Sequence, residues 1–280
     1  MRKLICAILF ASYGFLASAQ EIKEELLTLR LEARLDYLRN RQDGKTIKDN
    51  TGFEGKFINI RADGKITDKL SYSWRQRFNK QHEDGSFFDA TDWIYIHYNI
   101  GKWAIAGGKQ VVNIGGWEYD RAPIDLYECS VFWNNIPCYA IGASAGYRLS
   151  SSDLLTAQVC QSPFFTSENR NMYAYNLMWQ GSHKWFHTLY SVNLIETTPG
   201  HYINYIALGN KFIYKKFALE LDLMNRASAH QTFLFKDASV MGELSYAPCS
   251  KWNIYGKMTY DVNHTNNTTD FCVLPGTELT

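Results

Sequence analysis

Five arginines in the first third of the chain are placed so that they could act together on an anion. They are Arg30, Arg34, Arg61, Arg75 and Arg77. A guanidinium group presents several N–H donors in a planar fork, which suits it to bind phosphate or carboxylate. Together with Lys109, these side chains are expected to form a path that attracts small anionic groups.

Acidic side chains in the same stretches allow a different interpretation. Glu32, Asp36 and Asp63 alternate in step with the arginines, so all of them would share one face of the structure. The acids and bases could therefore form a lattice of ion pairs that stiffens a sheet. The sequence leaves both interpretations open.

A second group of charged and aromatic side chains lies in a long irregular segment, residues 103–139. Its candidates for a binding or narrowing role are Trp117, Glu118, Asp120, Arg121, Asp125 and Glu128. Long irregular segments in compact proteins are usually functional or disordered, and the aromatic content here argues against disorder. Because four acids oppose one base, we expect some of them to pair with wall arginines and hold the segment in place.

The sequence offers little for catalysis or metal binding, so we expect no enzyme, no cofactor and no metal. It contains no nucleophile elbow, P-loop or dinucleotide fingerprint. His183 and His187 would stand about 13 Å apart along a strand, too far to share one ion. Cys129 and Cys138 could be bridged in an oxidising compartment or remain free thiols.

The chain has 280 residues and a formal net charge of +1, so it lacks the basic field that would indicate nucleic acid as a partner. Residues 1–19 consist of a positively charged N-terminal part, a short apolar run and a cleavage site of small residues, and this order predicts a secretory signal peptide. The remaining residues, 20–280, are expected to form one domain.

Strict alternation predicts an all-β fold. In residues 27–37 every odd position is apolar and every even position is polar, so the two sets lie on opposite faces of a strand. The pattern recurs through the chain and predicts about thirteen strands, with a further one beginning at residues 269–274.

The connections and strand ends show a second pattern. Short turns largely alternate with longer polar connections, which are expected at residues 40–51, 81–91, 162–170 and 227–238. Aromatic residues recur near strand ends and could form interfacial girdles; they are Tyr37, Trp93, Trp103, Trp185 and Trp252.

Export, strands of about ten residues and alternating connections together favour an antiparallel transmembrane β-barrel over a soluble β-sandwich. In such a barrel the apolar face meets lipid and the charged face meets a water-filled lumen. Rows of arginine and lysine would then make the lumen selective for anions.

At Gly107-Gly108-Lys109-Gln110, Gly115-Gly116-Trp117-Glu118 and Arg121-Ala122-Pro123 the sequence resembles the phosphate-selective porin O and P family, in a Bacteroidetes-type form. The resemblance implies an outer-membrane barrel of about sixteen strands, a possible homotrimer and passage of small anionic solutes of the phosphate type. It also implies that a long loop, here residues 103–139, folds inward and narrows the pore.

The C-terminal end departs from that resemblance, because such barrels normally finish on a strand with a terminal aromatic residue. The chain ends at Leu279-Thr280, so we expect some C-terminal strands of the barrel to be missing from this sequence. Two other functions remain open from the sequence: a secreted, soluble β-sandwich that binds glycans, and a barrel enzyme of the outer membrane.

Overall fold

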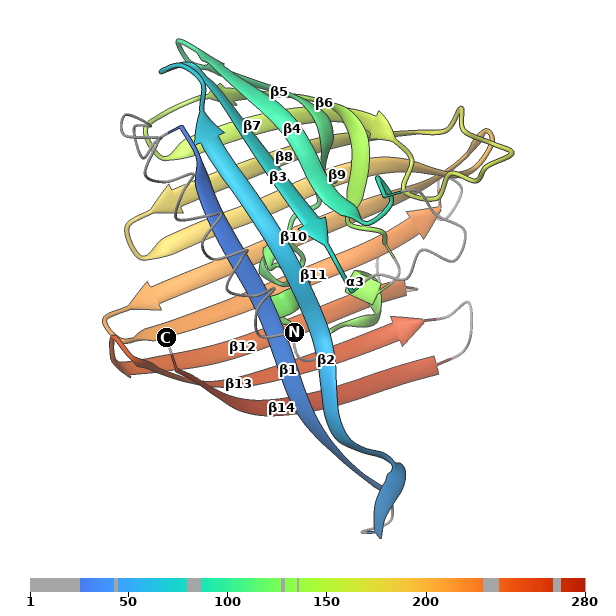
Figure 1. Cartoon of the computed structure of the whole chain (residues 1–280), viewed down its shortest axis with the longest axis vertical. Helices are drawn as coiled ribbons and strands as arrows, with labels where there is room; N and C mark the ends of the chain where they lie inside the picture. Colours follow the sequence, from blue (N-terminus) through green and yellow to red (C-terminus); the bar gives the residue numbers. More distant parts are fainter. Residues whose placement is uncertain are drawn as a thin grey trace, which may run out of the picture.

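A single antiparallel sheet accounts for nearly all of the fold. The computed structural model describes residues 26–42, 45–79, 87–126, 129–134, 136–228, 237–263 and 268–279. Its fourteen strands pair strictly in chain order from β1 to β14, and the sheet curls round on itself (Figure 1). In the described part of the chain no ladder joins β1 to β14, so the sheet is not closed.

The strands are β1 Thr28–Gln42, β2 Lys45–Lys65, β3 Leu70–Arg77, β4 Thr91–Ile100, β5 Trp103–Val111, β6 Tyr139–Arg148, β7 Asp153–Gln161, β8 Tyr173–His183, β9 Phe186–Thr198, β10 His201–Tyr214, β11 Phe217–Ser228, β12 Asp237–Cys249, β13 Trp252–Asn263 and β14 Thr268–Leu279. The segment between β5 and β6 contains the short helices α2 Trp117–Asp120, η1 Pro123–Asp125 and α3 Val131–Asn134. No helix in the described ranges has the length and apolar character needed to cross a membrane.

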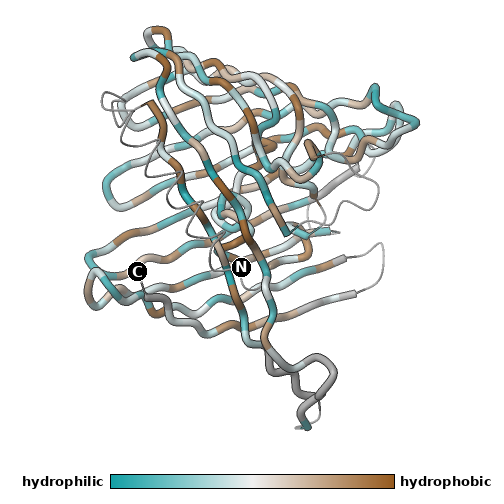
Figure 2. Tube along the Cα trace, viewed as in Figure 1, coloured by the Kyte–Doolittle hydropathy of each residue, from teal (hydrophilic) through white to brown (hydrophobic). Residues whose placement is uncertain are grey.

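Alternation along the strands creates two unlike faces. On β1 the outward side chains Leu29, Leu31 and Leu35 are 60%, 75% and 79% exposed. The inward face carries polar groups, and several of these, including Asn59 on β2 and Asn193 on β9, are fully buried. Figure 2 shows the resulting change between hydrophobic and hydrophilic positions along the strands. An outward apolar band with a polar interior is the arrangement of a transmembrane barrel.

The predicted strand pattern is confirmed, with a difference at one connection. The strand expected at residues 269–274 is β14, which runs from Thr268 to Leu279. The long connection expected at residues 40–51 is wrong, because β1 and β2 continue to pair until Gln42 meets Lys45. Between β9 and β10 the chain turns tightly at Pro199 and Gly200, and the positive φ of Gly200, 76°, permits the turn.

The segment between β5 and β6 folds into the space enclosed by the sheet and builds an apolar core there. Its residues Val112, Ile114, Tyr119, Phe132 and Ile136 pack with inward side chains of β6 to β11. The Phe132 ring meets the Tyr205 ring of β10 edge to face, with a centroid distance of 5.2 Å. The segment is therefore a packed part of the interior, as the aromatic content of the sequence predicts.

Candidate functional site

Three arginines form one row across the inner face of β1, β2 and β3. Arg30 stands directly opposite Arg61, and Arg61 stands directly opposite Arg75. Like charges placed opposite each other on neighbouring strands destabilise a sheet unless other charges compensate them. The row therefore needs acidic partners, or anions, beside it.

Acids on the same face supply most of that compensation. Arg75, whose side chain is only 1% exposed, binds Glu32 at 2.8 Å, and Arg61 binds Asp63 at 2.6 Å. Two further pairs complete the set: Arg77 with Asp92 at 2.9 Å and Arg34 with Asp36 at 2.8 Å. The lattice of ion pairs considered from the sequence is thus present. Arg30 differs, since it is exposed and forms no ion pair with any residue that the structure describes.

A one-residue bulge in β4 adds an aromatic ring to this face. The register shifts between Arg75 and Gln76, so that Asp92 has no opposite partner and both Asp92 and Trp93 turn toward the arginines. The guanidinium carbons of Arg61 and Arg75 lie 5.4 and 5.0 Å from the Trp93 ring centroid. The assignment of Trp93 to an interfacial girdle is therefore wrong, because the ring supports the arginine row.

Lys109 does not belong to this face. It stands opposite Ile94 on β4 and Ile141 on β6, and both isoleucines are half exposed on the outer surface. Its ammonium group instead reaches the carbonyl oxygen of Phe88, 3.0 Å away, beyond the end of the strand. Lys109 therefore lies outside the lumen, which corrects its expected place in the anion path.

The start of the inward segment rests on a polar ladder of the inner wall. Gln158 and Asn193, from β7 and β9, flank Asn176 of β8 in register. The Gln158 side chain accepts a hydrogen bond from the Asn113 backbone N–H at 2.8 Å, and Asn193 donates to the Asn113 carbonyl at 2.7 Å. The ladder holds the backbone of the segment against the wall.

Glycines let the segment approach the wall closely at its next residues. The Gly115 N–H donates to Ser191 Oγ at 2.8 Å, and the Gly116 N–H donates to the Leu189 carbonyl at 3.0 Å. A Cβ atom on Gly115 would lie 2.5 Å from that same carbonyl oxygen, so no larger residue fits without moving the backbone.

Glu118 is fully buried, and its contacts with the wall anchor the segment. Its carboxylate binds Lys257 Nζ of β13 at 2.6 Å and accepts hydrogen bonds from the backbone N–H and the hydroxyl of Ser130. Its own N–H donates to Asp222 of β11 at 2.8 Å. The expectation that acids of the segment would hold it in place fits Glu118, although its wall partner is a lysine.

Arg121 is the basic counterpart of Glu118 in this anchor. It lies between Glu220 of β11 and Glu243 of β12, at 2.5 and 2.7 Å, and these two acids stand directly opposite each other. Burial lowers the pKa of Arg121, but the hydrogen bond to Glu243 and the charge of Glu220 outweigh it and raise the pKa above the ordinary value for arginine. Arg121 therefore stays charged and relieves the repulsion between the two wall acids.

The other candidates of the segment have different positions. Lys211 Nζ lies over the Trp117 ring, 5.1 Å from the ring centroid, in a cation–π contact. Asp120 and Asp125 are exposed. Glu128 lies outside the described residues. Cys129 and Cys138 are not bridged by a disulfide.

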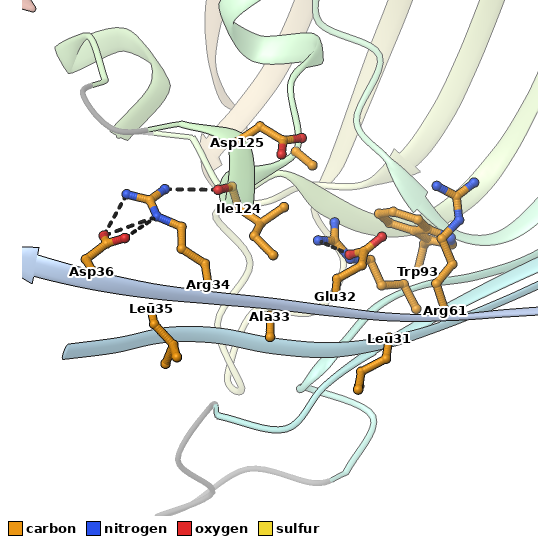
Figure 3. A pocket seen from close by; sticks show the side chains of 12 residues that line it. Leu31, Glu32, Ala33, Arg34, Leu35, Asp36, Arg61, Trp93, Ile124 and Asp125 are labelled. Carbon is orange, nitrogen blue, oxygen red and sulfur yellow. Dashed lines mark hydrogen bonds and ion pairs between the residues drawn. The ribbon is translucent and has the colours of Figure 1, made fainter. Parts of the chain in front are cut away.

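The tip of the segment and the arginine face enclose a cavity of about 640 Å³ (Figure 3). Ala122, Ile124 and Asp125 line it from the segment, and the strands contribute charged residues on the other side: Glu32, Arg34, Asp36, Arg61 and Arg75. The Arg34 guanidinium also donates to the carbonyl oxygens of Ile124 and Leu126, at 3.0 and 2.6 Å. Arg34 thus ties the tip of the segment to β1.

A second cavity, of about 660 Å³, follows along the same wall toward the turn between β2 and β3. Arg30, Lys65 and His97 line it, and Arg61 lines both cavities. The two cavities therefore adjoin at Arg61, beside the arginine row. Among the described residues no cluster of His, Cys, Asp and Glu could hold a metal ion.

Sequence reasoning missed three residues on which this arrangement depends. Lys257 alternates with outward Met258 and shares the inward face with Thr259 and Asp261, so its direction could have been read from the pattern. The role of Asp92 could not, because the bulge changes the alternation at that point. The role of Asp222 depends on which strand the segment meets.

Comparison with known proteins relates this sequence to one family of porins. The sequence matches the family described as phosphate-selective porin O and P over residues 27–185, more than half of the chain. No curated protein matches it. The solved outer membrane channel DcaP of Acinetobacter baumannii is similar over 92% of this chain and 99% of its own, with 8% identity and a TM-score of 0.48. A mutant of the Rh. blastica porin is similar over 91% of this chain and 100% of its own, with 10% identity and a TM-score of 0.48.

Proposed function

Because the chain belongs to the phosphate-selective porin O and P family, a family of outer-membrane channels, we propose that its lumen passes small anionic solutes by passive diffusion. The observation that carries the proposal is the row of Arg30, Arg61 and Arg75 along the inner wall. Arg61 lines both consecutive cavities, so an anion that leaves one meets the same guanidinium in the next. Rows of such groups select anions in water-filled pores.

The inward segment supplies the narrowing of this proposed channel. Its tip faces the arginine row across the first cavity, and Arg34 fixes the tip by two hydrogen bonds. The segment is also anchored just before its tip, at Glu118 and Arg121. Phosphate is one solute that fits the chemistry of guanidinium, and other small carboxylates and phosphates fit it equally.

The experiment is a conductance measurement in planar bilayers with a KCl gradient across the membrane. Wild-type protein should give open channels, and the sign of their reversal potential should show that chloride is more permeant than potassium. Arg30→Gln should reduce the chloride-to-potassium permeability ratio by about twofold, because it removes a lumen charge without breaking an ion pair. Lys251→Gln is the matched control, since Lys251 is an exposed lysine in the turn between β12 and β13. Absence of channels, or an Arg30→Gln ratio equal to that of wild type, would contradict the proposal.

The proposal includes export of the protein to the outer membrane and its assembly as a homotrimer. Export would use the signal peptide expected at residues 1–19, which lies outside the described residues. In fractionated cells the protein should remain in outer membranes washed with carbonate and dissolve only in detergent. The homotrimer should appear as three times the chain mass in detergent, and a monomeric mass would exclude it.

A further inference from the structure

The first cavity is lined by charges of opposite sign on its two sides. On the strand side, Arg34 is paired with Asp36 and Arg75 is paired with Glu32, both at 2.8 Å. These pairs cancel within the wall and leave Arg61 as the remaining charge of the cavity's strand side. Asp125 is the one ionisable group that the segment contributes among the described lining residues.

Both of the remaining charges are available to a solute. Asp125 is exposed, and its carboxylate forms no ion pair with a described residue. The Arg61 side chain is 33% exposed, and its acidic partner Asp63 lines the second cavity and not the first. In Figure 3 Asp125 and Arg61 approach the same space from the segment and from the wall.

Opposite charges across a water-filled gap act differently on different solutes. An anion is attracted by Arg61 but repelled by Asp125, so the two interactions partly cancel. A solute with an anionic group at one end and a cationic group at the other is attracted at both ends when it lies across the gap. A cavity of about 640 Å³ is within the size range that holds small molecules.

We propose that this passage favours small solutes that carry an ammonium group together with a carboxylate or phosphate. The anionic group faces Arg61 and the ammonium group faces Asp125. Amino acids and short peptides have this chemistry. The inference rests on the proposed function, because it requires an open lumen, but it assigns to Asp125 a role that an anion path alone does not need.

The test compares two solutes of similar size in a liposome-swelling assay: zwitterionic threonine and uncharged erythritol. In liposomes that contain the wild-type protein, threonine should enter faster relative to erythritol than size alone explains. Asp125→Asn should reduce the threonine-to-erythritol rate ratio by about two- to fourfold, because one of the two attractions is lost. Asp68→Asn is the matched control: Asp68 is an exposed acid in the turn between β2 and β3 and lines neither cavity.

A charge reversal separates the inference from a simple anion path. Asp125→Arg should raise the anion selectivity measured in a KCl gradient and at the same time lower the threonine-to-erythritol ratio. If the ratio is the same in wild type, Asp125→Asn and Asp125→Arg while erythritol still enters, the inference is overturned and the proposed channel stands. If neither solute enters liposomes that contain the wild-type protein, the channel itself is overturned.

Discussion

The Glu118–Lys257 pair shows what a single contact contributes in this interior. The two side chains are 0% and 3% exposed, so each charge depends on the other for the solvation that water would otherwise provide. Removing one partner leaves a buried charge without compensation, which is far more costly than the loss of a surface ion pair.

Lys257→Met should therefore lower the free energy of unfolding by about 3–5 kcal/mol. The double variant Lys257→Met with Glu118→Gln should recover part of that loss, because it removes the uncompensated carboxylate. Urea unfolding in lipid vesicles, followed by tryptophan fluorescence, measures both. Lys251→Met, at an exposed position, should unfold like the wild type. Equal losses in the single and double variants would show that the ion pair is not the source of the effect.

The cysteines offer a chemical probe of the same interior. Burial raises the pKa of the Cys138 thiol to about 11. Only the thiolate reacts with alkylating reagents, so at pH 8 Cys138 should react at least about tenfold more slowly with iodoacetamide than the exposed Cys249. The Cys138 rate should rise as the pH approaches 11. Mass spectrometry of peptides from the folded protein measures both rates, and equal rates at pH 8 would show that Cys138 is accessible.

Residue alternation predicted the direction of most wall side chains, and the exceptions have physical reasons. Arg30, Arg61 and Arg75 lie on the inner face as expected, since the strands pair in continuous register around them. Trp93 turned inward because the bulge shifts the pattern by one residue. Lys109 lies an even number of residues after outward Ile105 on the same strand, so it also points outward. The glycines just before Lys109 have no side chains, and they therefore hide this alternation in the sequence.

At the scale of elements, the segment between β5 and β6 depends on how closely it can approach the wall. Gly115 and Gly209 both lie where backbone meets backbone, and a Cβ atom on Gly209 would stand 2.9 Å from the Gly116 Cα. The sequence predicted that this segment is structured and inward. It could not predict the strands to which the segment binds, because those contacts join residues 45 to 139 positions apart.

Gly115→Ala should displace the segment, because the new Cβ would lie 2.5 Å from the Leu189 carbonyl and the backbone must move away. We expect a destabilisation of about 1–3 kcal/mol and a change in single-channel conductance. Gly256→Ala is the control, since a Cβ atom there meets nothing within 4 Å. Unchanged conductance and stability in Gly115→Ala would mean that the segment does not depend on this close approach.

The whole molecule is organised by its two faces. Fourteen strands in chain order present leucine, isoleucine and aromatic rings outward and charged or amide groups inward. The number of strands and their pairing were predictable, because alternation and turns are local features. The details of the interior were not, because the salt bridges and the bulge depend on the register between strands.

Leu177→Arg should test the outward face. Leu177 is 48% exposed in the middle of β8, and an arginine at such a position in lipid costs about 2–4 kcal/mol. Thr28→Arg is the comparison, because Thr28 lies on the inner face, lines the second cavity and stands opposite Asp63. Urea unfolding in lipid vesicles should show the loss for Leu177→Arg only. Equal stability of the two variants would mean that the outer face does not contact lipid.

The anchor of the inward segment also bears on the order in which the protein folds. Each ladder joins neighbouring strands, so the wall can grow one hairpin at a time. The contact between Glu118 and Lys257 spans 139 residues, and closing such a separation is a late and slow step. The segment can therefore complete its docking only after β13 has joined the sheet. Until then Glu118 lacks its lysine partner, so the inward segment is the last part of the interior to acquire its final shape.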